Sequence, residues 1–235
     1  HQQCVVFKRD DSMGLVIAIA VFLVLLFFVE RAKPDLVTRI EENVLATILA
    51  TMTLVSFAQV IARYGFNTGW GGALEFTRIL FAWMILFGMS YGIKIGSHLG
   101  VDAVIRLLPK KAFKATALFG ALCGVLYGAI LLYGDWLQFF GADARGGAID
   151  YWNKFFKIGI GLDDLRYPEW VQESFGIQER VQRWVAYLVL PLGLALFSFR
   201  CAQAFFQIWR GDRDLMIAGH EAEDLVAENI STLRD

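Results

Sequence analysis

A serine near the middle of the chain stands in the pattern that hydrolases use to present a nucleophile. Residues 88–92, Gly-Met-Ser-Tyr-Gly, match the G-x-S-x-G motif around Ser90. That motif acts where a strand turns sharply into a helix and a histidine serves as base. Here it lies inside the apolar run 79–95, while His98 follows that run and His220 lies in a polar tail. We interpret these small residues as positions for close helix packing and not as a hydrolase site.

Residues that could bind a cofactor are few and scattered. No histidine lies within an apolar run, so the axial ligation of a membrane haem protein is not available. The three cysteines, Cys4, Cys123 and Cys201, are odd in number, and no Cys and His residues have zinc-site spacing. We therefore expect no catalytic, substrate-binding or metal site, no cofactor and no enzymatic activity. The formal net charge of −1 also gives no reason to expect a nucleic-acid partner.

Three charged residues, Arg63, Glu75 and Arg78, mark the facing ends of two apolar runs that are joined by a short turn. Glu75 and Arg78 are three residues apart on one expected helix, so they can neutralise each other at headgroup depth. Ionisable groups in membrane helices are equally candidates for function, and the sequence leaves both interpretations open. Alone, Arg63 would be a snorkelling anchor. We predict that the three form a boundary cluster that acts through packing and anchoring, not by binding substrate.

The elements that position these residues are long apolar runs, in a chain that is 57% hydrophobic. A helix needs about 20 apolar residues to cross a bilayer, and only helices or closed barrels satisfy their backbone there. The runs predict an all-α membrane protein with a four-helix transmembrane core, an extra N-terminal transmembrane helix and interfacial helices. The runs are Met13–Val29, Val44–Ala62, Ile79–Ile95, Ala115–Gly134 and Trp184–Phe199.

The first run is followed by charged residues and no small-x-small cleavage site, so we interpret it as an uncleaved anchor or span. Apolar residues in Val101–Leu108 recur at helical spacing, which predicts a helix lying on the inner surface.

Basic residues predict the orientation, because cytoplasmic connections carry an excess of Lys and Arg. They concentrate in 30–42, in 96–114 and after the last run, whereas Arg63 is the only base in 63–75 and acids outnumber bases in 135–183. The first set should face the cytoplasm together with the C-terminus. The outer connection 135–183 is rich in Tyr, Trp and Phe, which fits an aromatic belt or a docking surface.

The remaining polar residues fit a membrane partner better than a permeation pathway. Gln59 is interpreted as a hydrogen-bonding link between helices, Trp70 and Trp83 as interfacial and packing aromatics, and His98 as an interfacial residue. A transporter core would need an internal repeat or charged residues near the middle of its membrane helices, and neither is visible in this sequence. The alternative is a membrane anchor or assembly subunit of an unrelated complex, such as a respiratory one.

Taken in order, these residues resemble the small membrane subunit (DctQ-like) of TRAP transporters, the tripartite ATP-independent periplasmic transporters. The last run, with Tyr187–Gly193 followed by Arg200, resembles that subunit's last helix. The resemblance covers 41–211, which leaves 1–40 as an N-terminal extension with a hydrophobic anchor and 212–235 as a polar cytoplasmic tail. The set that carries it is Gln59, Arg63, Tyr64, Phe66, Trp70, Glu75, Arg78, Trp83, Gly88, His98, Val101 and Asp102.

The resemblance implies a multi-pass protein of the bacterial inner membrane that acts as scaffold for a much larger membrane subunit. That large subunit would carry the substrate and sodium sites, and a separate periplasmic binding protein would deliver an organic acid. Two features depart from the usual family pattern: the extra run Met13–Val29 and the long connection 135–183.

Overall fold

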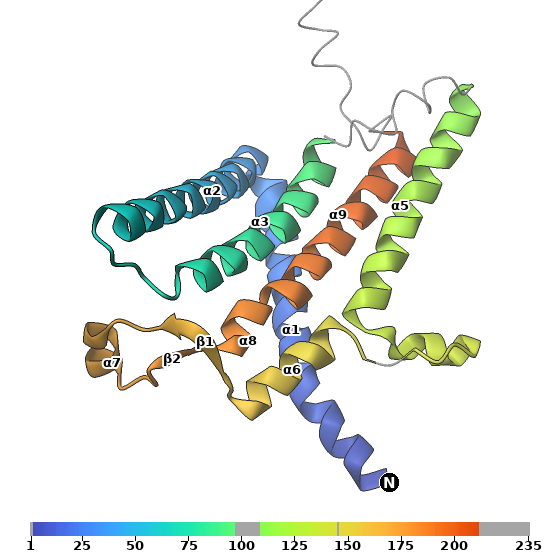
Figure 1. Ribbon diagram of the computed structural model, residues 1–235. Coiled ribbons are helices and arrows are strands. Elements are labelled where there is room, and N and C mark those ends of the chain that lie inside the picture. The colour runs from blue at the N-terminus through green and yellow to red at the C-terminus, as the bar shows by residue number, and fades with distance from the viewer. Residues whose placement is uncertain (1, 97–108, 145, 212–235) are drawn as a thin grey trace, which may run out of the picture. The chain divides into compact units, whose positions relative to one another are not determined.

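The structure is a computed structural model that describes residues 2–96, 109–144 and 146–211 (Figure 1). Within these residues, five helical segments are long and apolar enough to cross a membrane, and the sheet is limited to two short strands. The expected all-α membrane fold is confirmed, including the extra N-terminal helix. The five segments are Met13–Ala32, Pro34–Gly65, Ala73–Ile95, Lys114–Leu132 and Arg183–Arg210.

Four of the sequence predictions fall on residues that the structure does not describe. They are the interfacial helix Val101–Leu108, the family-motif positions His98 and Asp102, and the polar tail 212–235.

The first two helices, α1 (Gln2–Ala32) and α2 (Pro34–Gly65), are separated by a single residue, Lys33. Pro34 fits the first helical turn because its fixed φ suits the helix and its missing N–H would have no intrahelical partner. Helix α2 therefore includes charged residues that the sequence analysis assigned to the connection 30–42. At 1.5 Å per residue the 32 residues of α2 span ~48 Å, more than the ~30 Å of hydrocarbon in a bilayer.

The connection after α5 (Lys110–Leu132) is folded. It comprises a 3-10 helix, η1 (Gly134–Phe140), then α6 (Ala148–Ile158), β1 (Gly161–Arg166), α7 (Glu169–Phe175) and β2 (Arg180–Gln182). The strands are antiparallel, with Gly161 opposite Gln182, Arg166 opposite Arg180 and an irregularity between these pairs. A small hairpin thus precedes the last membrane segment.

That last segment consists of α8 (Arg183–Tyr187) and α9 (Val189–Arg210), which are divided at Leu188. Pro191 explains the division, because its nitrogen has no hydrogen to donate to the carbonyl of Tyr187 one turn earlier. The helix resumes at once: Leu192 N–H donates to Leu188 O over 3.3 Å. Pro191 is therefore a local break in an otherwise continuous segment.

Residue contacts divide the chain into two units. The first holds residues up to Gly88 together with 129–196, and the second holds 89–128 and the chain from Phe197 onward. In the second unit, α5 packs on α9 through small residues: a Cβ on Gly124 would lie 2.6 Å from Cys201 Sγ, and one on Gly128 would overlap the Ser198 hydroxyl. Close packing between membrane helices depends on such small residues.

The G-x-S-x-G motif lies within α3 (Ala73–Ile95), and Ser90 is only 3% exposed. A buried serine in the middle of a helix has none of the strand-to-helix geometry of a nucleophile elbow. The interpretation of this motif as a helix-packing segment agrees with the structure.

Candidate functional site

The α2–α3 turn is fixed by a side chain of α2. The Gln59 amide donates to Trp70 O and accepts from Trp70 N–H, each over 3.0 Å. Gly69 lies directly beside this pair, since a Cβ there would be 3.1 Å from Gln59 Nε2. The Trp70 ring in turn lies 5.5 Å from the ring of Phe76 in the first turns of α3. Gln59 of α2 thus binds the backbone of the turn that leads into α3, and a direct bond from Gln59 to another helix stays a prediction.

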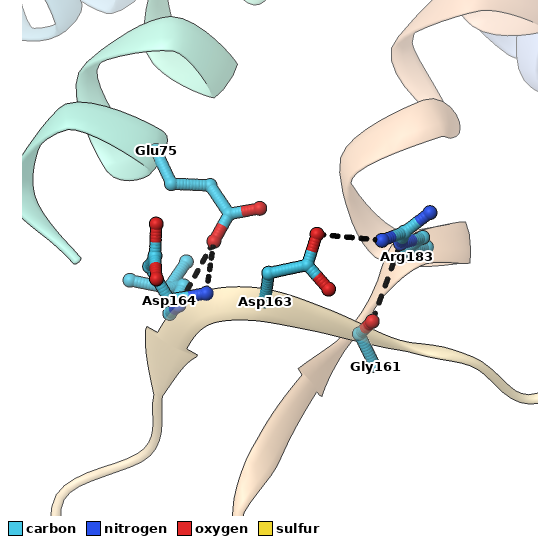
Figure 2. A network of polar contacts seen from close by, with 6 residues as sticks. Glu75, Gly161, Asp163, Asp164 and Arg183 are labelled. Carbon is cyan, nitrogen blue, oxygen red and sulfur yellow. Dashed lines mark hydrogen bonds and ion pairs between the residues drawn. The ribbon is translucent and has the colours of Figure 1, made fainter.

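Glu75, in the first turn of α3 (Ala73–Ile95), binds the hairpin. Its Oε2 accepts hydrogen bonds from the backbone N–H groups of Asp164 (2.8 Å) and Leu165 (2.9 Å). Figure 2 shows the carboxylate reaching from α3 to β1. Hydrogen bonds with one ionised partner are roughly twice as strong as those between neutral groups. One carboxylate therefore satisfies two strand amides that lie 89 and 90 residues further along the chain.

The three members of the predicted boundary cluster do not form a bonded unit here. Among the residues that the structure describes, no ion pair joins Glu75 to Arg63 or Arg78, and both arginines are exposed. Arg63 lines an open groove of ≈ 460 Å³ together with Gln59 and Trp70. A role of the three residues as boundary anchors stays a proposal, but the partner of Glu75 is the hairpin backbone.

Apolar contacts and a glycine complete the junction between α3 and the hairpin. Leu162, Leu165 and Ala186 are buried together, and Phe76 and Ile79 of α3 pack against them. Gly72 allows this approach: a Cβ there would lie 2.9 Å from Asp164 O. Since that neighbour is backbone, any larger residue at position 72 would displace the strand.

Arg183, the first residue of α8 (Arg183–Tyr187), holds the other end of β1. Its Nη2 lies 2.9 Å from Asp163 Oδ2 and its Nε donates to Gly161 O over 3.2 Å, as Figure 2 shows. The Arg183 N–H also donates to Ile160 O over 3.0 Å. β1 is thus bound at both ends to helices that enter candidate membrane spans.

Aromatic residues of α6 pack against each other and against α8. The Trp152 Nε1–H donates to Trp184 O over 2.9 Å, and the Trp152 and Phe156 rings stack at 5.0 Å. Tyr151 and Phe155 of α6 (Ala148–Ile158) meet Tyr187 of α8 at 5.4 and 4.9 Å. The aromatic density of the connection 135–183 therefore serves in large part to fix α6 on α8, and Trp170, which is 67% exposed, does not join that packing.

Two other family-motif positions lie apart from the junction. The Trp83 ring lies 5.4 Å from the ring of Phe87 on the same helix, and Tyr64 is 83% exposed. Arg200 differs from expectation: the sequence analysis ended the last run at Phe199, but α9 continues to Arg210 and Arg200 is buried. Its Nη1 donates to Gln203 Oε1 over 2.7 Å.

The sequence analysis missed Gly72, Asp163 and Arg183. The pair Gly71-Gly72 directly before a helix was a signal of close backbone approach, whereas nothing in the sequence linked Arg183 to Asp163. In the described part of the chain, no three His, Cys, Asp or Glu residues come together as a metal site would require. Charged side chains thus bind backbone groups and hold the β1–β2 hairpin to α3 and α8.

Comparison with known proteins extends this description. Residues 52–211 match the family model for tripartite ATP-independent periplasmic transporters, DctQ component. The C4-dicarboxylate TRAP transporter small permease protein DctQ of Vibrio cholerae is 38% identical over 194 residues, 79% of this chain and 78% of that protein. The protein of the same name from Pseudomonas aeruginosa is 27% identical over 213 residues, 79% of this chain and 90% of that protein. The one from Rhodobacter capsulatus is 28% identical over 200 residues, 72% and 75% of the two chains.

Proposed function

This chain belongs to the family of DctQ components of TRAP transporters, and from that membership we propose that it holds the large membrane subunit of a sodium-coupled C4-dicarboxylate importer. It is a small permease subunit, a multi-pass protein of the inner membrane, and the family is not enzymatic. The alternative of an anchor for an unrelated respiratory complex is thereby set aside.

The substrate part of the proposal rests on the names of the relatives. Those of Vibrio cholerae, Pseudomonas aeruginosa and Rhodobacter capsulatus are each named for C4-dicarboxylates. Because the family resemblance puts the substrate and sodium sites in the large subunit, this chain would share the substrate of its partner without binding it.

The observation that carries the scaffold role is the unburied surface of α2 (Pro34–Gly65). No residue in its apolar membrane window is buried against the rest of the chain, and Val37, near its start, is the only buried residue recorded along it. Helices within one membrane subunit normally bury one face against their neighbours. Only a stripe that includes positions 45, 48, 52 and 55 is partly covered, and most of the remaining surface of α2 is exposed. That exposed surface has room for a second protein as well as lipid, and we assign that place to the large subunit. A periplasmic binding protein would be the third component.

Transport by reconstituted proteins tests this proposal. Liposomes that contain this chain, its large subunit and the binding protein should take up radiolabelled succinate under an inward sodium gradient. Omitting this chain, or replacing sodium by potassium, should reduce uptake to background. Full uptake without this chain would refute the scaffold role, and uptake by this chain alone would refute the assignment of the substrate site to the partner.

The orientation is a separate part of the proposal. We expect the connection around Lys111 and the C-terminus to face the cytoplasm, and the α5–α8 connection to face the periplasm. Single cysteines at Lys111 and Glu173, in a chain without native cysteines, can be probed on intact cells with an impermeant thiol reagent. We expect labelling at position 173 only. Labelling at 111 but not at 173 would show the opposite orientation and refute this part of the proposal.

A further inference from the structure

An open groove of ≈ 470 Å³ runs along one side of α6 (Ala148–Ile158). Gly146, Gly147, Asp150, Tyr151, Asn153, Lys154 and Lys157 line it. Positions 150, 153, 154 and 157 have the i, i+3, i+4, i+7 spacing of a single helix face, so their side chains follow one stripe. The glycines place the first turn of the helix, with its free backbone N–H groups, at one end of the groove.

Asn153 is the unusual residue of this stripe. It is only 7% exposed, and no hydrogen bond of its side-chain amide is recorded among the described residues. The amide atoms of Asn153 are not among the fully buried atoms without a partner, so they meet the groove that the residue lines. A ligand in the groove that both accepts from and donates to this amide would replace water there.

Charges are separated along the same stripe. Asp150 lies toward the N-terminal end, and Lys154 and Lys157 lie toward the C-terminal end. Asp150 and Lys154 are four residues apart, a spacing that favours pairing, yet no ion pair between them is recorded in the described part of the chain. The rise from position 150 to 154 is ~6 Å. A ligand that matches this pattern carries a cation and an anion a few ångströms apart.

The location of α6 favours a lipid as the source of such a ligand. The helix follows the candidate span Lys114–Leu132 and precedes the span Arg183–Arg210, and it packs against α1 and α8. It therefore lies where a chain leaves and re-enters a bilayer. Phe156 and Ile158 of the same helix are exposed, as are Phe139 and Phe140 of η1, and can contact acyl chains.

We propose that the groove on α6 binds the headgroup of a phospholipid that carries both a phosphate and a primary ammonium. Lys154 binds the phosphate, Asn153 donates to a phosphate oxygen, and Asp150 accepts from the ammonium. This site would fix the outer connection at the membrane surface. The inference goes beyond the scaffold role and does not depend on the transported substrate.

Lipid retention by the full chain tests the proposal. The purified protein in detergent is titrated separately with phosphatidylethanolamine, phosphatidylcholine and phosphatidylglycerol, and bound lipid is counted by native mass spectrometry. We expect phosphatidylethanolamine to bind most tightly, and Lys154→Gln and Asp150→Asn each to weaken it about fivefold or more, in line with the loss of a charge-assisted hydrogen bond. Lys33→Gln, which removes a lysine outside the groove, is the matched control and should leave binding unchanged.

Two further measurements test whether Asn153 contacts the lipid and whether the groove binds the whole lipid or only its soluble headgroup. Asn153→Asp keeps the size of the side chain and adds a repelling charge, so it should lower phosphatidylethanolamine binding while the melting temperature confirms folding. If the variant does not fold, the Lys154 and Asp150 variants decide. Inorganic phosphate and glycerophosphoethanolamine should compete only weakly. Equal binding of all three lipids, tight binding of inorganic phosphate alone, or unchanged binding in both the Lys154 and Asp150 variants would overturn the proposal.

Discussion

Removing the Glu75 carboxylate should release the β1–β2 hairpin from α3. In Glu75→Ala the amide of Leu165, a residue only 8% exposed, loses its recorded acceptor, and an unsatisfied buried donor costs ~2 kcal/mol. In Glu75→Gln a neutral oxygen can still accept both bonds, at about half the strength, so the loss should be ~1 kcal/mol. Arg78 is exposed and has no recorded ion pair, so Arg78→Gln should change the free energy of unfolding by less than ~0.5 kcal/mol.

Hydrogen exchange at the Asp164 and Leu165 amides measures this effect directly. Since 1.4 kcal/mol corresponds to a factor of ten, exchange should quicken about fivefold in Glu75→Gln and about thirtyfold in Glu75→Ala. Arg78→Gln is the matched control and should leave exchange at these amides unchanged. Unaltered exchange in Glu75→Ala would refute the junction. Faster exchange in Arg78→Gln as well, by a smaller factor than in Glu75→Gln, would instead restore the paired boundary cluster.

Two pairs of glycines give further predictions. Gly72→Ala should destabilise the hairpin by ~1–3 kcal/mol, because its Cβ would lie 2.9 Å from a backbone oxygen. Gly71→Ala should be close to neutral, because nothing lies within 4 Å of a Cβ at that position. The rate of proteolysis in the α5–α8 connection compares the two variants. Gly124→Ala should lower the melting temperature of the purified chain, because its Cβ would lie 2.6 Å from the Cys201 thiol of α9. Gly120→Ala, with nothing within 4 Å of its Cβ, should leave the melting temperature unchanged. Equal melting temperatures of the two variants would contradict the assigned packing of α5 on α9.

Long apolar runs made the membrane helices predictable. Their length and lack of charge admit few other folds in a bilayer, and the structure has a helix at each of the five runs. The helix ends were harder to predict, because charged residues continue a helix beyond the hydrocarbon. α2 begins at Pro34 instead of Val44, and α9 continues past Arg200 to Arg210.

The junction at Glu75 was only half predictable. Its place at the end of a span marked the residue as important, and the arginines nearby were the natural partners to expect. The actual partner is backbone, which has no signature in a sequence. The strand that supplies it reads Gly-Leu-Asp-Asp-Leu-Arg, without the regular alternation of a half-buried strand, so the hairpin could not be recognised from its pattern.

Because Glu75 binds amide groups and not side chains, the contact places little demand on the identity of the residues that it holds. Positions 164 and 165 can each supply an N–H with any amino acid except proline. The hairpin can therefore accumulate substitutions at Asp164 while its attachment to α3 persists, provided that Glu75 and Gly72 are kept. Such an attachment lets the exposed side chains of the hairpin change in evolution while the contact between the hairpin and α3 is kept.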